Sequence, residues 1–260
     1  MKFEKASKSK TKLRLALFGV SGGGKSYSAL RIATGLSNGG KIAVVDTERG
    51  SVSLYADKFN FDVLDLDNKS IDSYVEAIKL AEKSGYEVLI IDSLTHAWQE
   101  LLDEVDKIAR AKYKGNSWAA WNEGTPKYKK LIDSILNFNG HIIATMRSKT
   151  EWSVESDGGR NKPVRVGLSP EQRQGIEFEF SMLLEINQDH IAHCIKDRTG
   201  KYQDKLIDKP DESFGKEILD WLNSSPTLLP KSPIASKIEP IAIDSTANEL
   251  KGYTMNWKPL

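Results

Sequence analysis

Cysteine is almost absent from this sequence, in which Cys194 is the single thiol among 260 residues. One cysteine cannot form an internal disulfide, and no group of cysteines and histidines has the spacing of a metal site. Long hydrophobic runs are also missing, since none approaches the roughly 20 residues that a membrane-spanning helix needs. The lysine-rich segment 1–12 is not followed by the apolar stretch of a signal peptide. These absences predict a protein of the reducing cytoplasm that has no membrane partner.

An excess of charge of one sign is missing as well. Lysine and arginine number 37 and aspartate and glutamate 36, which leaves a formal net charge of +1. A near-neutral chain has no global attraction for a polyanion, so any nucleic-acid site has to be local. The composition, with 39% hydrophobic and 28% charged residues, is that of an ordinary globular protein long enough for one large domain.

Strand-like and helix-like segments alternate through the first part of the chain. Apolar segments typical of buried strands lie at 13–18, 41–46, 61–66, 87–92 and 141–146. Between them, helical patterns occur at 24–37 and 71–84, and two further helices are expected before Phe138. This alternation predicts an α/β fold with a mostly parallel central sheet and helices on both faces.

The pattern changes after Arg147. Residues 148–170 are polar, contain glycine and have no apolar period, which predicts a long functional or disordered loop. Three strand-like runs follow, and turn residues between them predict antiparallel hairpins at the sheet edge; they lie at 178–186, 190–196 and 202–207. A helix at 214–222 is expected to close the core. The predicted organisation is an N-terminal arm, a core and a flexible tail, at 1–12, 13–223 and 224–260.

A glycine-rich segment between the first expected strand and helix matches the pattern G-x-x-x-x-G-K-[ST] at every fixed position. Its glycines let several backbone N–H groups turn toward phosphates at a helix N-terminus. The residues expected to contact the nucleotide are Gly19, Val20, Ser21, Gly22, Gly23, Gly24, Lys25, Ser26 and Tyr27. Lys25 is expected to reach the β- and γ-phosphates, and Ser26 to ligate Mg²⁺. The segment therefore predicts that the protein binds ATP with Mg²⁺.

Two carboxylates at expected strand ends complete the predicted chemistry. Asp92 ends the apolar strand Val88–Asp92 and is expected to hold Mg²⁺ through its water shell. Glu48 follows the strand at 41–46 on the same sheet edge, where hydrolysis needs a base to orient the attacking water. A solvated loop glutamate is the alternative for Glu48.

The order of these motifs resembles the RecA superfamily of recombinases and DnaB-like helicases. The D-x-E setting of that family's catalytic glutamate matches Asp46-Thr47-Glu48, and its Walker B aspartate followed by serine matches Asp92-Ser93. The resemblance implies sensor residues at Thr145 and Arg147, although bacterial RecA has glutamine at the position of Thr145. The chain looks like the minimal RecA-core ATPases of bacteriophages, which implies recombination or single-strand annealing in a host cytoplasm.

Later strands of RecA-type proteins present two basic residues to the ATP of the neighbouring subunit. Lys196-Asp197-Arg198 matches the K-x-R spacing of that pair. The resemblance implies that Lys196 and Arg198 act in catalysis across an interface, as an arginine finger stabilises a transferring phosphoryl group. A solvated strand end is the alternative. ATP is then expected between the protomers of a homo-oligomer, either a filament or a ring.

Positive charge is concentrated at 107–130, with seven basic residues against one acid, Glu123. Aromatic residues are interleaved with them, as a sequence-tolerant site for single-stranded DNA requires. The candidate contacts here are Lys112, Lys114, Trp118 and Trp121. In RecA-type proteins a second DNA loop follows the sensor strand, and the candidates there are Lys149, Arg160, Lys162 and Arg165. Packed tryptophans and solvated lysines are the alternative, and the segment 148–170 nets only +1.

An N-terminal F-x-x-A, formed by Phe3 and Ala6, resembles the polymerisation motif of eukaryotic and archaeal recombinases. In that motif the phenylalanine fills a pocket on the next subunit while the backbone extends that subunit's sheet. The sequence as a whole predicts a RecA-like ATPase that acts on single-stranded DNA and assembles head to tail. A DnaB-type ring translocase or helicase, and a P-loop ATPase switch or kinase that acts without DNA, are the alternatives.

Overall fold

The computed structural model describes residues 3, 7, 8, 11–157 and 160–224, of which residues 152–157 and 160–166 are described by their backbone alone. The strands are β1 (Arg14–Gly19), β2 (Ile42–Asp46), β3 (Asp62–Asp65), β4 (Val88–Asp92), β5 (His141–Asp157), β6 (Arg160–Pro170), β7 (Met182–Ile186), β8 (Ile191–Asp197) and β9 (Leu206–Asp208). The α-helices are α1 (Lys25–Ser37), α2 (Ile71–Lys83), α3 (Leu94–Lys112), α4 (Ser117–Asn137) and α5 (Glu212–Asn223). Short 3-10 helices occupy η2 (Val52–Tyr55) and η3 (Ile176–Phe178). Most of the predicted arm and tail lies outside the described residues, so those two segments stay predictions.

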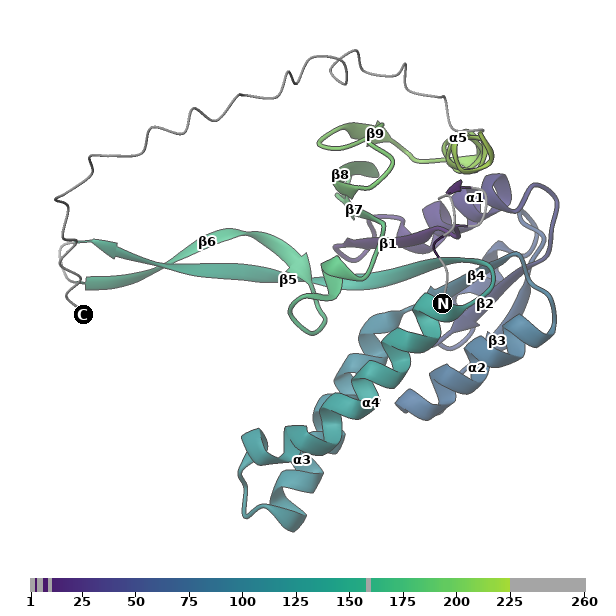
Figure 1. Ribbon diagram of the computed structural model, residues 1–260. Coiled ribbons are helices and arrows are strands. Elements are labelled where there is room, and N and C mark those ends of the chain that lie inside the picture. Colours follow the sequence, from purple (N-terminus) through teal and green to yellow (C-terminus); the bar gives the residue numbers. More distant parts are fainter. Residues whose placement is uncertain (1–2, 4–6, 9–10, 158–159, 225–260) are drawn as a thin grey trace, which may run out of the picture. The chain divides into compact units, whose positions relative to one another are not determined.

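One sheet organises the described chain, with strand order β3-β2-β4-β5-β1-β7-β8-β9 (Figure 1). The strands from β3 to β7 in this order pair in parallel, and β8 and β9 add antiparallel pairs at one end. The predicted fold class, a mostly parallel sheet flanked by helices with antiparallel strands near the C-terminus, is confirmed. None of the helices in the described ranges combines the length and apolar character of a membrane span.

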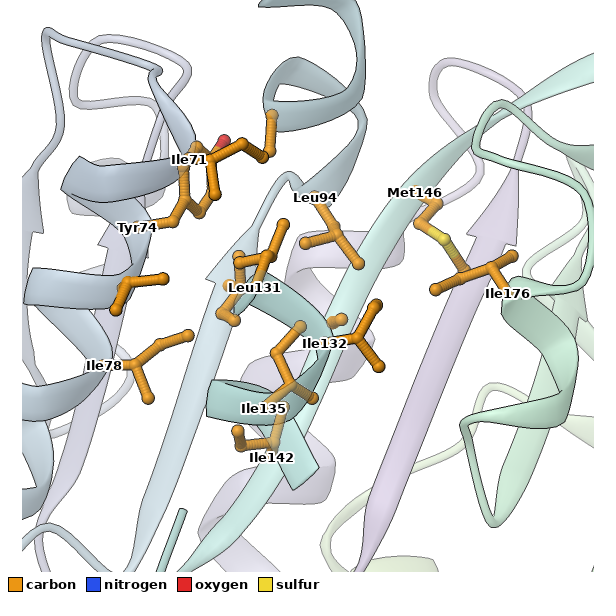
Figure 2. Close-up of a cluster of buried hydrophobic side chains, with 14 of the residues drawn as sticks. Ile71, Tyr74, Ile78, Leu94, Leu131, Ile132, Ile135, Ile142, Met146 and Ile176 are labelled. Atoms are coloured by element: carbon orange, nitrogen blue, oxygen red, sulfur yellow. The ribbon is translucent and has the colours of Figure 1, made fainter. Parts of the chain in front are cut away.

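Helices cover both faces of the sheet because side chains alternate along each strand. In β1, Leu15 and Leu17 pack in the layer that contains α1 and α5. Ala16 and Phe18 pack in the opposite layer, with α2, α3 and α4. Figure 2 shows side chains from α2, α4 and β5 in this second cluster, among them Tyr74, Ile78, Leu131, Ile135 and Ile142. Burial on both faces explains why the parallel strands have nearly continuous apolar sequences.

The segment after Arg147 differs from the sequence prediction. The long loop predicted at 148–170 is wrong, because this segment forms an antiparallel hairpin of β5 and β6. Parallel strands between two helix layers need apolar side chains on both faces, which gives them a strong sequence signal. Among the described strands, β6 pairs with β5 alone and lies off the path of the central sheet, so it lacks that signal. The overlooked signal is a period of two in the sequence, visible in Val164, Val166 and Leu168.

Candidate nucleotide-binding site

The parallel strands β1, β2 and β4 end at one edge of the sheet, where the parallel pairing of β5 with β1 also ends, at Arg147. Asp46 of β2 lies opposite Asp92 of β4, and Gly19 of β1 lies opposite Arg147 of β5. Ligands of open α/β sheets bind in the crevice outside the carboxyl ends of such strands. Residues from separate sequence motifs therefore meet at this edge.

The loop between β1 and α1 depends on glycine at two positions. Gly24 caps α1 with a φ of 84°, a conformation that other residues rarely adopt. A Cβ atom on Gly19 would lie 2.1 Å from the carbonyl oxygen of Ile186 in β7, so only glycine permits this close approach. The loop thereby directs the N-terminus of α1, with its free N–H groups, toward the crevice.

The Lys25 ammonium is held inside this loop. Its Nζ donates to the carbonyl oxygens of Gly19 at 3.1 Å and Val20 at 2.8 Å. Burial lowers the pKa of Lys25, while the carboxylates of Asp92 and Glu48 act in the opposite direction. A bound phosphate oxygen can therefore replace the loop carbonyls as the hydrogen-bond acceptor of Lys25.

Asp92 is 2% exposed, and its two carboxylate oxygens differ. Oδ1 accepts a hydrogen bond from the hydroxyl of Thr145, whereas Oδ2 is buried and has no hydrogen-bond partner within the described residues. Burial raises the pKa of Asp92, and the hydroxyls of Ser26 and Thr145 lower it. Mg²⁺ is bound by few carboxylates and keeps several waters. A buried, unpartnered carboxylate oxygen close to a serine hydroxyl therefore fits the metal that an ATP site implies.

Glu48 leaves β2 in a turn that Asp46 holds. The Asp46 carboxylate accepts hydrogen bonds from the N–H groups of Glu48 at 2.6 Å and Val52 at 3.1 Å. Oε1 of Glu48 accepts a hydrogen bond from the Arg147 guanidinium at 2.8 Å. The predicted water-orienting carboxylate and the predicted sensor arginine are thus joined as an ion pair.

These side chains surround a cavity of about 620 Å³ that the P-loop, Glu48, Asp92 and Arg147 all line. Glu171, which directly follows β6, lines it too and accepts a hydrogen bond from the Gln99 amide at 2.7 Å. No sequence motif marks Glu171, because its place in the cavity depends on the return of the hairpin. The β5–β6 hairpin therefore begins and ends at the cavity.

Aromatic rings form another part of the lining. Tyr27, which was predicted from its place after the P-loop, packs edge to face on Tyr55 and Phe59 with ring centroids 5.4 and 5.3 Å away. Tyr27 and Tyr55 line the cavity. Aromatic faces of this kind suit a nucleotide base. Tyr55 and Phe59 are missing from the sequence prediction, and their spacing of four was the available signal.

Lys196 and Arg198 are not among the residues that line this cavity. Lys196 Nζ donates to the carbonyl oxygens of Glu177 at 2.7 Å and Phe178 at 3.1 Å. Arg198 directly follows β8 and is exposed. The structure does not bring these cations to the P-loop of their own chain, so their catalytic role stays a prediction.

The two tryptophans predicted to contact DNA differ in exposure. Trp118, in the first turn of α4, is 87% exposed. Trp121 stacks on Trp98 of α3 with ring centroids 5.6 Å apart, and the Arg173 guanidinium lies 5.3 Å from its ring centre. The packed alternative therefore describes Trp121, whereas Trp118 has a free ring face.

One of the predicted basic DNA contacts, Lys112, has an acidic partner, and so do two other lysines of the basic segment 107–130. Lys112 pairs with Glu123 at 2.9 Å, and two further lysines of 107–130 form ion pairs, Lys127 with Glu104 and Lys130 with Asp72. These pairs reduce the local excess of positive charge. Lys114, in the turn between α3 and α4, and Lys149 of β5 are exposed. The remaining candidates, Arg160, Lys162 and Arg165, lie in β6, where the structure describes only the backbone.

The predicted self-association motif is described in part. The Phe3 side chain is fully exposed, and Ala6 lies outside the described residues. A candidate acceptor for such an arm is the edge strand β3, on which Val63 and Leu64 are exposed. Beside β3 lies a cavity of about 190 Å³ whose apolar lining includes Leu80 of α2.

A protein-family model described as an AAA domain matches residues 11–217. No curated protein matches the sequence. The matched range covers most of the chain and includes every residue of the cavity. The chain therefore belongs to this AAA domain family and is a P-loop ATPase.

Proposed function

We propose that this ATPase is RecA-like and couples ATP hydrolysis to single-stranded DNA in recombination or strand annealing. The observation that carries the proposal is the convergence of Lys25, Glu48, Asp92 and Arg147 on one cavity. The same cavity contains both ends of the β5–β6 hairpin, at Arg147 and Glu171. A change at the phosphates can therefore reach an element that extends away from the site.

Hydrolysis requires a water oxygen to attack the γ-phosphorus in line with the bond to the β–γ bridging oxygen, which breaks as ADP leaves. Glu48 orients that water and takes its proton, because it is a carboxylate at the cavity whose turn Asp46 fixes. Lys25 places its charge on the β- and γ-phosphates, where negative charge has to be stabilised. The backbone N–H groups at the start of α1 add neutral donors to the same phosphates.

Ser26 and Asp92 would hold Mg²⁺, which neutralises charge on the β- and γ-phosphate oxygens when it is bound. Thr145 fixes the orientation of Asp92 through the bond to Oδ1, and Oδ2, which has no partner among the described residues, would be available to the water shell of a bound Mg²⁺. Thr145 therefore serves the site as a positioning residue, although bacterial RecA has glutamine at this place.

Arg147 links the phosphate site to Glu48. Its guanidinium is paired with the Glu48 carboxylate at 2.8 Å, and a γ-phosphate offers it a more highly charged partner. Transfer of the guanidinium to the phosphate frees Glu48 to orient water. Because Arg147 belongs to β5, the same movement acts on the first residues of the hairpin.

Two exposed elements supply the proposed DNA surface. Trp118 and Lys114 lie where α3 and α4 are joined, and an exposed ring with a nearby cation suits a base and its phosphate. The β5–β6 hairpin adds Lys149 and the basic residues of β6. Both elements come from regions where the RecA resemblance places DNA contacts.

Assembly is proposed to occur head to tail. Among the described strands, β3 has a neighbour on one side alone, so its other edge offers backbone groups for pairing, and an apolar cavity lies beside it. An extended arm with one aromatic anchor requires both features. The exposed Phe3 is the proposed anchor. In such an assembly Lys196 and Arg198 of one subunit would serve the ATP of its neighbour. A closed ring, as in a DnaB-type translocase, uses the same contacts with a different closure.

The test of the proposed function is the ATPase rate with and without oligo-dT, with Lys25→Ala as the inactive control. We expect DNA to raise kcat of the wild-type protein and to leave the control without turnover. A rate that oligo-dT leaves unchanged, with no DNA binding in the presence of a non-hydrolysable ATP analogue, would support the ATPase switch without DNA. Electron microscopy of the same mixture separates filaments from rings.

A further inference from the structure

His190, which no motif marks, lies against the P-loop and is not among the residues that line the cavity. Its Nδ1 is 3.1 Å from the carbonyl oxygen of Gly23. A carbonyl oxygen only accepts hydrogen bonds, so Nδ1 carries the proton and donates it. The next glycine is packed on the same ring, because a Cβ on Gly24 would lie 3.0 Å from Nδ1.

The orientation of one peptide group gives this contact a consequence for phosphate binding. The Gly23 carbonyl and the Gly24 N–H belong to the same trans peptide, in which C=O and N–H point in opposite directions. When His190 holds the carbonyl, the N–H of Gly24 is turned away from the imidazole. Gly24 lines the cavity and His190 does not, so this N–H is on the side of the cavity. Gly24 is the N-cap of α1, so this N–H is one of the donors available to an anion.

The turn between β7 and β8 holds His190 in place. The Asn187 side chain accepts hydrogen bonds from the N–H groups of Asp189 and Ile191, both at 3.0 Å. His190 itself has a φ of 65°, a left-handed conformation in which histidine, asparagine and aspartate are enriched. Its carbonyl accepts a hydrogen bond from the Lys209 N–H at 3.1 Å. A Cβ on Gly23 would lie 3.0 Å from the Asn187 carbonyl oxygen, so the whole turn packs on the loop.

We propose that His190 is a positioning residue of the phosphate site, which fixes the Gly23–Gly24 peptide with its N–H directed to the phosphates. The proposal rests on nucleotide binding at the P-loop. Without the imidazole donor, this peptide can rotate, and binding of phosphate has to restore its orientation. The loss falls on nucleotide affinity, because the N–H contacts substrate and transition state alike.

The test compares His190→Gly, which accepts the left-handed φ and removes the donor, with His190→Asn. Asparagine also tolerates this φ and places an amide N–H at the δ position that Nδ1 occupies. Gln188→Ala, in the same turn, is the control for a change that leaves the contact intact. Binding of N-methylanthraniloyl-ADP is followed by fluorescence, and KM and kcat for ATP are measured on the same preparations.

His190→Gly is expected to raise the Kd for the labelled ADP and the KM for ATP by about three- to tenfold, the range of one net hydrogen bond, with kcat within about twofold. His190→Asn is expected to restore most of the affinity. Wild-type affinity in His190→Gly, or equal losses in the Gly and Asn variants, would overturn the role of the hydrogen bond. Wild-type protein that binds no nucleotide would refute the ATPase itself, a result distinct from either.

Discussion

Two glutamates share the cavity, and their partners distinguish their roles. Glu48 is paired with the Arg147 guanidinium, and its charge acts on the pKa of Lys25. Glu171 accepts a hydrogen bond from the neutral amide of Gln99. The carboxylate close to the phosphate-binding lysine is the one that can orient a water at the γ-phosphate. Glu48 is therefore the carboxylate that we propose for this work.

Replacement of Glu48 tests that assignment. Glu48→Gln keeps the size of the side chain and removes the base, so we expect nucleotide affinity within about threefold of wild type and kcat lower by about 10²- to 10⁴-fold. Steady-state ATPase assays and labelled-ADP binding measure the two quantities. Glu171→Gln is the matched control in the same cavity and should keep most of its turnover. A reversed pattern, with the loss in the Glu171 variant, would transfer the role to Glu171.

The residues of the site divide by how local their signals are. The P-loop could be predicted because its function needs fixed residue types within eight consecutive positions, Gly19 to Ser26. The places of Asp92 and Glu48 at the sheet edge could be predicted because Asp92 ends and Glu48 follows an apolar strand of a parallel sheet. The role of Glu48 as a water-orienting base depended on the resemblance to the RecA superfamily. His190 and Glu171 could not, since each reaches the site through a turn whose contacts are tertiary.

The helical hairpin of α3 and α4 and the β5–β6 hairpin have different sequence signals. The helices α3 and α4 pack on the sheet and on each other, so they have an apolar face with helical period that the sequence predicts. The β5–β6 hairpin extends beyond that packing, and residues 148–170 lack the continuous apolar run that marks parallel strands such as β1 and β4. A polar segment of this kind matches the composition of a loop, which is why the prediction was wrong there.

The α3–α4 hairpin gives a paired test for DNA binding. Trp118→Ala removes an exposed ring, so we expect single-stranded DNA to bind more weakly by about 1–3 kcal/mol per stacked base with unchanged stability. Trp121→Ala removes a ring packed between Trp98 and Arg173, so we expect a loss of about 2–3 kcal/mol in the free energy of unfolding. Fluorescence anisotropy with labelled oligo-dT and urea unfolding measure the two effects. Undiminished DNA affinity in the Trp118 variant would exclude this end of the hairpin as a stacking site.

The two edge strands of the sheet, β3 and β9, differ from each other. One end carries the antiparallel strands β8 and β9, which α5 follows, and the other is the short parallel strand β3, in which every residue is exposed. The β3 edge and the exposed Phe3 would supply the two halves of the heterologous contact that we propose. Such contacts propagate from one copy to the next, and they do not close in pairs.

The proposed contact predicts that donor and acceptor defects are separable. Phe3→Ala should leave a folded monomer that binds ATP and no longer self-associates, because the buried ring supplies most of the energy of an anchored arm. Leu80→Glu should produce the same loss from the acceptor side, since it places a charge beside the apolar cavity at β3. Leu206→Glu, at an exposed leucine of β9 on the other end of the sheet, is the matched control and should assemble normally.

Light scattering with ATP analogue and DNA measures assembly, and mixtures reveal its polarity. A Phe3→Ala copy still has an intact β3 edge, so it should cap wild-type assemblies and shorten them in proportion to its share. A mixture of Phe3→Ala and Leu80→Glu copies has one intact donor and one intact acceptor, so it should form dimers and nothing larger. Full assembly of the Phe3→Ala protein alone would place the interface in the core of the fold. Assembly lost equally in the Leu206→Glu control would show that the β3 edge has no special part in it.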